Sequence, residues 1–204
     1  MKKFISLLCV LAVISCKKDE VTSEEPGLMD TMDEIQNITK AGDAIKGFEK
    51  RIEELKKLEP ISNDIYKEVF ADRLDDLTRT DLSIGATSAL GLSSGEAKYK
   101  EENSNKSLNL SIFDGAGEYG TAMINMTYLS LAMEMESIQN TTTKKTETFN
   151  GIKCLTENNT NPNQIRSTIT FLYKERFSVT LEGNNMDLDE LKSYMKKLDL
   201  SKLD

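Results

Sequence analysis

The chain has 204 residues, with 26 Lys and Arg against 34 Asp and Glu, which gives a formal net charge of −8. This acidic balance argues against a nucleic-acid-binding protein, because affinity for nucleic acid comes mainly from Lys and Arg side chains that neutralise phosphates. The sequence contains no histidine and three cysteines. Histidine-based catalysis is therefore excluded, and a zinc or other transition-metal site is disfavoured.

The chain begins with a pattern typical of an exported protein. Lys2 and Lys3 precede an apolar run at residues 4–14. This run is too short to span a bilayer, which takes about 20 apolar residues, and has the length of the hydrophobic part of a signal peptide. The sequence therefore predicts a signal peptide at residues 1–15.

Residues 13–16, Val-Ile-Ser-Cys, resemble the lipobox of bacterial lipoproteins. The resemblance implies that a diacylglycerol is attached to the Cys16 sulfur and that the chain is cut just before it. Lys18-Asp19-Glu20 is similar to the signal that sends Bacteroidota lipoproteins to the outer face of the outer membrane. We expect a lipid-anchored protein of the outer membrane, at the cell surface or facing the periplasm. The alternative is an ordinary secretory signal with a cysteine that carries no lipid.

Residues 16–27, the lipidated cysteine and an acidic stretch, are expected to form a flexible tether. Residues 28–58 predict a helix, because apolar residues recur at spacings of three and four. The stripe consists of Ile38, Ala41, Ile45, Phe48, Ile52 and Leu55. It favours packing within the monomer over a short coiled coil that would dimerise the protein. A second helix at residues 63–77 would complete a helical segment over residues 28–78.

Residues 79–204 predict a domain built from hairpins. Strands are expected at residues 80–87, 96–100, 107–113, 144–149, 152–156, 167–173 and 177–182. Residues 96–100 and 107–113 predict one hairpin, and residues 167–173 and 177–182 predict another around Lys174-Glu175. Residues 144–149 and 152–156 are expected as strands on either side of Asn150-Gly151. Leu108, Leu110 and Ile112 alternate with Asn109 and Ser111, which is typical of a strand with one buried and one wet face.

Two helices are expected among and after these strands. The most apolar stretch, residues 118–137, predicts a largely buried helix that carries Met123, Met126 and Met133. Methionines on such a helix fill gaps in a core or, less often, line a pocket for apolar ligands. Asp187 and Glu190 predict a capping box at the start of the last helix. The expected fold class is α+β: a mostly antiparallel sheet with the helices packed on one face, preceded by an N-terminal helical segment.

Three motifs resemble functional sites but lack essential parts. Residues 91–95, Gly-Leu-Ser-Ser-Gly, match a nucleophile elbow without a histidine base, and we interpret them as a flexible loop. Residues 115–120 match the glycine spacing of a dinucleotide-binding turn, but Asp114 would face a pyrophosphate with negative charge. Residues 185–189 are spaced like the first ligands of a calcium loop, but Glu190 replaces the glycine that the loop requires. No cofactor and no metal are expected.

The sequence favours a membrane-anchored envelope lipoprotein without catalytic activity that binds a protein partner or an apolar ligand. One alternative is a carboxylate-dependent hydrolase of the cell envelope, since carboxylates are plentiful and need no histidine. Another is a structural spacer or dimerisation protein built on residues 28–58. Two carboxylates facing each other in a cleft would favour the hydrolase, and an apolar slot lined by Met123, Met126 and Met133 would favour the binding protein. Cys154, the cysteine left after processing and lipidation, is expected to be a small buried residue.

Overall fold

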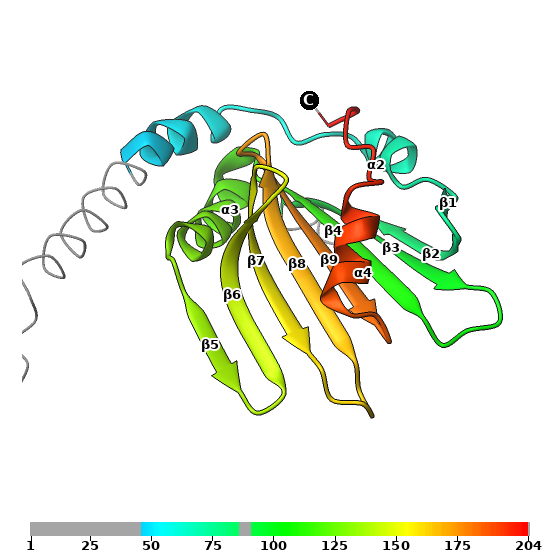
Figure 1. The fold of residues 1–204 in the computed structure, drawn as a ribbon. Coiled ribbons are helices and arrows are strands. Elements are labelled where there is room, and N and C mark those ends of the chain that lie inside the picture. The colour runs from blue at the N-terminus through cyan, green and yellow to red at the C-terminus, as the bar shows by residue number, and fades with distance from the viewer. Residues whose placement is uncertain (1–45, 86–90, 204) are drawn as a thin grey trace, which may run out of the picture. The chain divides into compact units, whose positions relative to one another are not determined.

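The computed structural model describes residues 46–85 and 91–203 (Figure 1). The strands are β1 Arg73–Leu74, β2 Leu77–Ile84, β3 Ser93–Glu101, β4 Ser107–Asp114, β5 Glu136–Gln139, β6 Thr142–Phe149, β7 Ile152–Asn159, β8 Arg166–Tyr173 and β9 Phe177–Asn184. The helices are α2 Asn63–Val69, α3 Gly117–Ala132 and α4 Leu188–Met195, and residues 46–55 are also helical. The signal peptide, the lipidated cysteine and the tether predicted for residues 1–27 lie outside the described residues.

The strands form one nine-stranded sheet in the order β1-β2-β3-β4-β9-β8-β7-β6-β5. Every neighbouring pair is antiparallel. The chain first makes β1 to β4, then crosses over through α3 to the far edge, and returns strand by strand until β9 pairs with β4 (Figure 1). The predicted α+β class with a mostly antiparallel sheet is confirmed.

The predicted hairpins are confirmed, and their turns explain why. Between β6 and β7, Asn150 and Gly151 have φ angles of 50° and 78°. An Asn-Gly turn adopts positive φ at both positions easily, and its twist matches that of the flanking strands. Between β8 and β9, Lys174 and Glu175 also have positive φ angles, of 52° and 50°.

One face of the sheet, which we call the core face, is covered by α2 and α4. β4 turns Leu108, Leu110 and Ile112 to this face, each at most 2% exposed. The same hydrophobic cluster includes residues of α2, α4 and the C-terminal segment, among them Tyr66, Phe70, Leu191, Tyr194, Leu200 and Leu203. The domain's main core therefore lies between these helices and the sheet.

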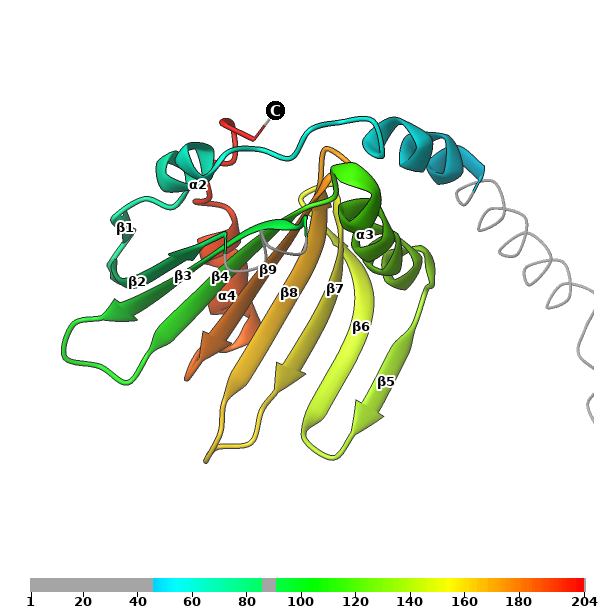
Figure 2. The ribbon, with the colours of Figure 1, turned by 180° about the vertical axis from the view of Figure 1, so that it is seen from behind.

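α3 lies on the opposite face, which we call the open face. Figure 1 shows α4 in front of the sheet, and Figure 2, from behind, shows α3 in front. Thr127 on α3 shares a hydrogen bond of 3.3 Å with Ser178, whose side chain leaves β9 opposite to the buried Val179. The prediction that the helices pack on one face is wrong. α2, α4 and the C-terminal segment already fill the core face, so the crossover helix packs on the other side.

Residues 46–55 pack on the outer part of α3. Phe48 and Leu55 are buried with Ile124 of α3 in a second hydrophobic cluster, and Ile52 packs against it. The Phe48 ring stacks on Tyr128 with 3.6 Å between ring centroids. The described half of the predicted stripe thus packs within the monomer, while Ile38, Ala41 and Ile45 lie outside the described residues.

Three local predictions are wrong. The helix predicted for residues 63–77 ends at Val69. Its last predicted apolar positions, Leu74 and Leu77, belong to strands β1 and β2 and are buried there. The end of the helix predicted for residues 118–137 is part of β5. Ser93 to Gly95, predicted as a flexible loop, begin β3. Short apolar runs fit both helix and strand spacing, so periodicity alone does not separate the two.

In the part of the chain that the structure describes, no helix is long and apolar enough to cross a membrane.

Candidate binding surface

α3 turns a row of large apolar side chains to solvent. Tyr119 is 67% exposed, Met123 49%, Met126 66%, Leu129 40% and Met133 56%. Tyr119, Met123 and Met126 follow the spacing i, i+4 and i+7, which places them along one side of the helix, and Met133 follows as its C-cap residue. We call these five residues the α3 strip. The prediction that this helix is largely buried is therefore wrong for the residues of the strip, including the predicted Met123, Met126 and Met133.

The strip faces outward because α3 approaches the sheet through small residues. A Cβ on Gly120 would lie 2.8 Å from the Asp114 carbonyl oxygen, so only glycine lets the helix start this close to β4. Next to it, the Thr121 hydroxyl donates to the carbonyl oxygens of Gly115 (3.1 Å) and Gly117 (2.5 Å). The inner side of α3 is narrow at its start and farther along buries Ile124 and Leu131, so the residues of the α3 strip lie on its outer side.

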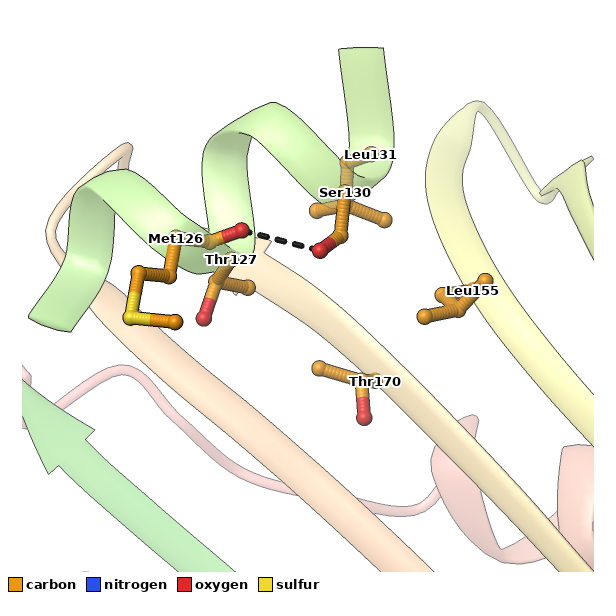
Figure 3. Close-up of a pocket in the computed structure, with 6 residues that line it drawn as sticks. All are labelled: Met126, Thr127, Ser130, Leu131, Leu155 and Thr170. Atoms are coloured by element: carbon orange, nitrogen blue, oxygen red, sulfur yellow. Dashed lines mark hydrogen bonds between the residues drawn. The ribbon is translucent and has the colours of Figure 1, made fainter. Parts of the chain in front are cut away.

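A hollow of about 170 Å³ lies between α3 and the open face (Figure 3). Its lining consists of Met126, Thr127, Ser130, Leu131, Leu155 and Thr170. The Ser130 hydroxyl donates to the Met126 carbonyl oxygen at 2.9 Å, and Thr170 shares a hydrogen bond with Thr180 at 3.1 Å. The hydroxyls are therefore engaged, and the hollow offers mainly carbon surface. It is smaller than the roughly 300–1,000 Å³ of typical small-molecule sites and fits an inserted side chain better.

Of the three methionines predicted to line a ligand site, Met123 and Met126 lie on α3 and Met133 is its C-cap residue. All three belong to the α3 strip, and Met126 also lines the hollow beside it. The structure thus brings them together as an exposed surface with one small depression.

Asp114 and Arg176 form a buried ion pair that the sequence gave no reason to expect. The Arg176 guanidinium donates through Nε to Oδ1 (2.7 Å) and through Nη2 to Oδ2 (2.9 Å) of a carboxylate that is 0% exposed. The backbone N–H groups of Ile61 and Ala116 donate to the same carboxylate, at 2.8 and 3.0 Å. Arg176 also donates to the Glu59 carbonyl oxygen at 3.1 Å. The pair fastens the segment before α2 to the ends of β4 and β9.

These contacts explain the glycine motif at residues 115–120. Its preceding acid, Asp114, is fully occupied by Arg176 and backbone donors. A Cβ on Gly115 would lie 2.7 Å from the Arg176 carbonyl oxygen, and Gly117 has a φ of 77°. The glycines therefore allow a tight passage from strand β4 to helix α3.

The serine of the elbow-like motif is part of the core face. The buried Ser93 hydroxyl contacts the Ile61 carbonyl oxygen (3.1 Å) and the Tyr66 hydroxyl (3.2 Å). Two residues on, a Cβ on Gly95 would lie 2.4 Å from the Phe70 ring. The glycine is needed because the aromatic rings of α2 rest directly on β3.

The remaining sequence candidates also have structural partners. Cys154 is buried, and burial raises the pKa of its thiol to about 11, as fits a packing residue. Asp187 caps α4 by accepting from the Glu190 N–H at 2.8 Å, but the Glu190 carboxylate pairs with Lys106 at 2.5 Å and does not close the predicted box. Over residues 46–85 and 91–203, no group of three His, Cys, Asp or Glu side chains is arranged to hold a metal ion.

Within residues 46–85 and 91–203, several carboxyl groups have a displaced pKa, and each displacement is downward. Hydrogen bonds from Lys56 and Lys67 lower the pKa of Glu53 and Asp64, respectively. Burial alone would raise the pKa of Glu147, but bonds from Lys192 and Lys145 outweigh it and leave this pKa lowered.

Comparison with known proteins adds no relative: no family model, no curated protein and no solved structure matches the chain.

Proposed function

We propose that the protein is a membrane-anchored lipoprotein of the cell envelope that acts by binding, and that the α3 strip receives an apolar segment of a protein partner. The observation that carries this proposal is the exposure of five large apolar side chains along α3 and at its C-cap residue, Met133. Exposed apolar surface of this extent is typical of interaction sites, because it costs free energy when left in water.

The shape of the surface supports a protein segment over a small ligand. The strip follows the spacing by which two helices pack side by side, with the small Ser130 at the position between Met126 and Met133. Beside Ser130 the hollow accommodates one apolar side chain of the partner. Methionine side chains are flexible and polarizable, so the surface can adapt to varied partners.

The non-catalytic part of the proposal rests on how the reactive groups are used. Ser93, Asp114 and Cys154 all take part in buried packing contacts. The displaced carboxyl pKa values are lowered, whereas a general acid at neutral pH needs a raised pKa. We therefore place binding ahead of the hydrolase.

The anchor is tested by metabolic labelling with radioactive palmitate. We expect the wild-type chain to carry label and the Cys16→Ser chain to carry none and to leave the membrane fraction. An unlabelled wild-type chain would contradict the lipoprotein proposal while leaving the binding surface untouched.

The binding surface is tested by a photo-crosslinking amino acid at Met126 in the full-length chain in cells, with the exposed Lys100 on β3 as matched control position. We expect a discrete protein adduct from position 126 that disappears when Met123→Glu is added, and none from position 100. Equal adducts at both positions, adducts to lipid alone, or no adduct at position 126 would each refute the proposal.

A further inference from the structure

A second hollow, of about 350 Å³, lies where α4 ends against β7 and β8. Six of its lining residues are apolar or aromatic: Ile152, Phe171, Tyr173, Met195, Leu198 and Leu200. Phe171, Met195 and Leu200 also belong to the core on the α2 and α4 side of the sheet, so this hollow and the α3 strip are separate places. Its volume reaches the range of small-molecule sites, about 300–1,000 Å³.

Apolar surface in this hollow is open to solvent. Ile152, at the start of β7, is 36% exposed. An occupant that covers this side chain would gain the free energy of removing it from water.

Apart from the Tyr173 hydroxyl, the polar side chains at the hollow are those of Asn150 and Lys196. The ammonium groups of Lys196 and Lys192 lie 5.1 and 5.4 Å from the centroid of the Phe149 ring. Lys192 is neutralised by Glu147 at 2.9 Å. For Lys196, no carboxylate of the described residues lies within ion-pair distance. Among the described residues, the hollow thus combines an apolar lining with one positive charge that has no ion-pair partner, in a protein whose overall charge is negative.

We propose that this hollow binds a single-chain fatty acid, with the alkyl chain against Ile152, Phe171 and Leu198 and the carboxylate at the Lys196 ammonium. The carboxylate supplies the negative charge that Lys196 lacks, and the Phe149 ring holds the ammonium in place. A volume near the lower end of the small-molecule range suits one short alkyl chain. This inference is independent of the α3 strip.

The test is a titration of residues 17–204 with decanoate, followed by NMR of ¹³C-methyl-labelled methionine. This soluble form contains all members of both hydrophobic clusters, which fall between residues 48 and 203. Met195 lines the hollow and Met126 lies on the α3 strip, so the two signals report the two places separately. We expect decanoate to shift the Met195 signal and to leave the Met126 signal in place.

The chemistry of the ligand is tested by chain length and charge. We expect affinity to rise about fourfold per CH₂ from hexanoate to decanoate, as burial of each methylene predicts. Decyltrimethylammonium has the same chain and the opposite charge, and we expect it to bind at least tenfold more weakly. An unshifted Met195 signal at all concentrations below micelle formation, or equal binding of the two amphiphiles, would overturn the proposal.

Point variants of the lining residues test where on the protein decanoate binds. Ile152→Glu should abolish the Met195 shift, whereas the matched Ile138→Glu, at a 69% exposed position on β5, should not. Lys196→Gln should weaken decanoate binding at least fivefold, Lys196→Arg should retain it, and Lys57→Gln should have no effect. If Lys196→Gln binds like wild type, the assigned carboxylate site is wrong. Should Ile152→Glu fail to fold, the ligand series on the wild-type chain still decides the question.

Discussion

The two faces of the sheet are made by the same strands but are covered very differently. On β4, Leu108, Leu110 and Ile112 point to the core face and are at most 2% exposed. Asn109 and Ser111, between them, point to the open face and are only half-buried. The core face is closed by α2, α4 and the C-terminal segment, while α3 covers the open face in part and keeps its own largest apolar residues outside. The comparison suggests a division of labour in which the core face supplies stability and the open face supplies a surface for binding.

The largest effect should come from the ion pair that closes the core at the ends of β4 and β9. Arg176→Met leaves the Asp114 carboxylate buried without its cation, and we expect the free energy of unfolding to fall by about 3–5 kcal/mol. Urea denaturation of residues 17–204 measures this change. Lys67→Met, which removes an exposed partner of Asp64 on α2, serves as control and should change little. Similar midpoints for the two variants would show that the buried pair has no special weight.

A direct comparison of the two faces uses one truncation on each. Leu110→Ala removes a 2% exposed side chain from the core face and should cost about 2–5 kcal/mol of unfolding free energy. Met126→Ala removes a 66% exposed side chain from the α3 strip and should cost less than about 0.5 kcal/mol. Both are measured by urea denaturation. Comparable losses would mean that the strip is part of the core and would end the proposed division.

A glycine substitution probes the close contact between α2 and β3. Gly95→Ala places a Cβ 2.4 Å from the Phe70 ring and 2.9 Å from Tyr66, and overpacking of this kind should cost about 1–3 kcal/mol. Gly47→Ala, in the helical residues 46–55, meets nothing within 4 Å and should stabilise by up to about 1 kcal/mol through helix propensity. Thermal unfolding of both variants gives opposite shifts in Tm if the packing is as described. A Gly95→Ala variant as stable as wild type would contradict it.

The smallest effect, absent at neutral pH, concerns two groups on the core face. Burial raises the pKa of Tyr99 from 10.0 to about 12 and that of Cys154 from 9.0 to about 11. The native state therefore favours their neutral forms. Their contribution to stability is complete below pH 9 and is lost as the pH rises through 11 and 12.

Urea denaturation at pH 7, 9, 10 and 11 should show a free energy of unfolding that falls with pH. Tyr99→Phe lowers stability at pH 7, because the hydroxyl donates to the Ala71 carbonyl oxygen at 3.1 Å, but it should make the fall above pH 10 shallower. An unchanged slope in this variant would show that the Tyr99 hydroxyl does not titrate in the unfolding equilibrium.

The hairpins were predictable because their information is local. The alternation of apolar and polar residues from Leu108 to Ile112 specifies which face of the strand is buried. The Asn150-Gly151 turn specifies where the chain reverses direction. Neither depends on the rest of the chain. The N-cap at Asp187 is local in the same sense, since its acceptor and donor are three residues apart. The second interaction of the capping box, from the Glu190 carboxylate back to the helix start, is not formed. A residue distant in sequence, Lys106, pairs with that carboxylate instead.

The residues of the α3 strip could be predicted in part from the sequence, but their exposure could not. The sequence identified Met123, Met126 and Met133 as unusual, but a helix this apolar is expected to be buried. Its exposure depends on Gly115 and Gly120, which let α3 approach the sheet through its narrow side, and on a core face that other segments already fill. The ion pair of Asp114 and Arg176 could not be predicted either, because its partners are 62 residues apart and lie in unrelated local patterns.

The sequence by itself determined the class of the fold, the hairpin pairs and the expectation of a lipid anchor at Cys16, since each depends on neighbours along the chain. Only the tertiary structure decided that β9 returns to β4, that α3 lies apart from α2 and α4, and that Asp114 meets Arg176. These features arise because several segments compete for the same buried space. The segments are far apart along the chain, so no local sequence pattern shows which of them will occupy it.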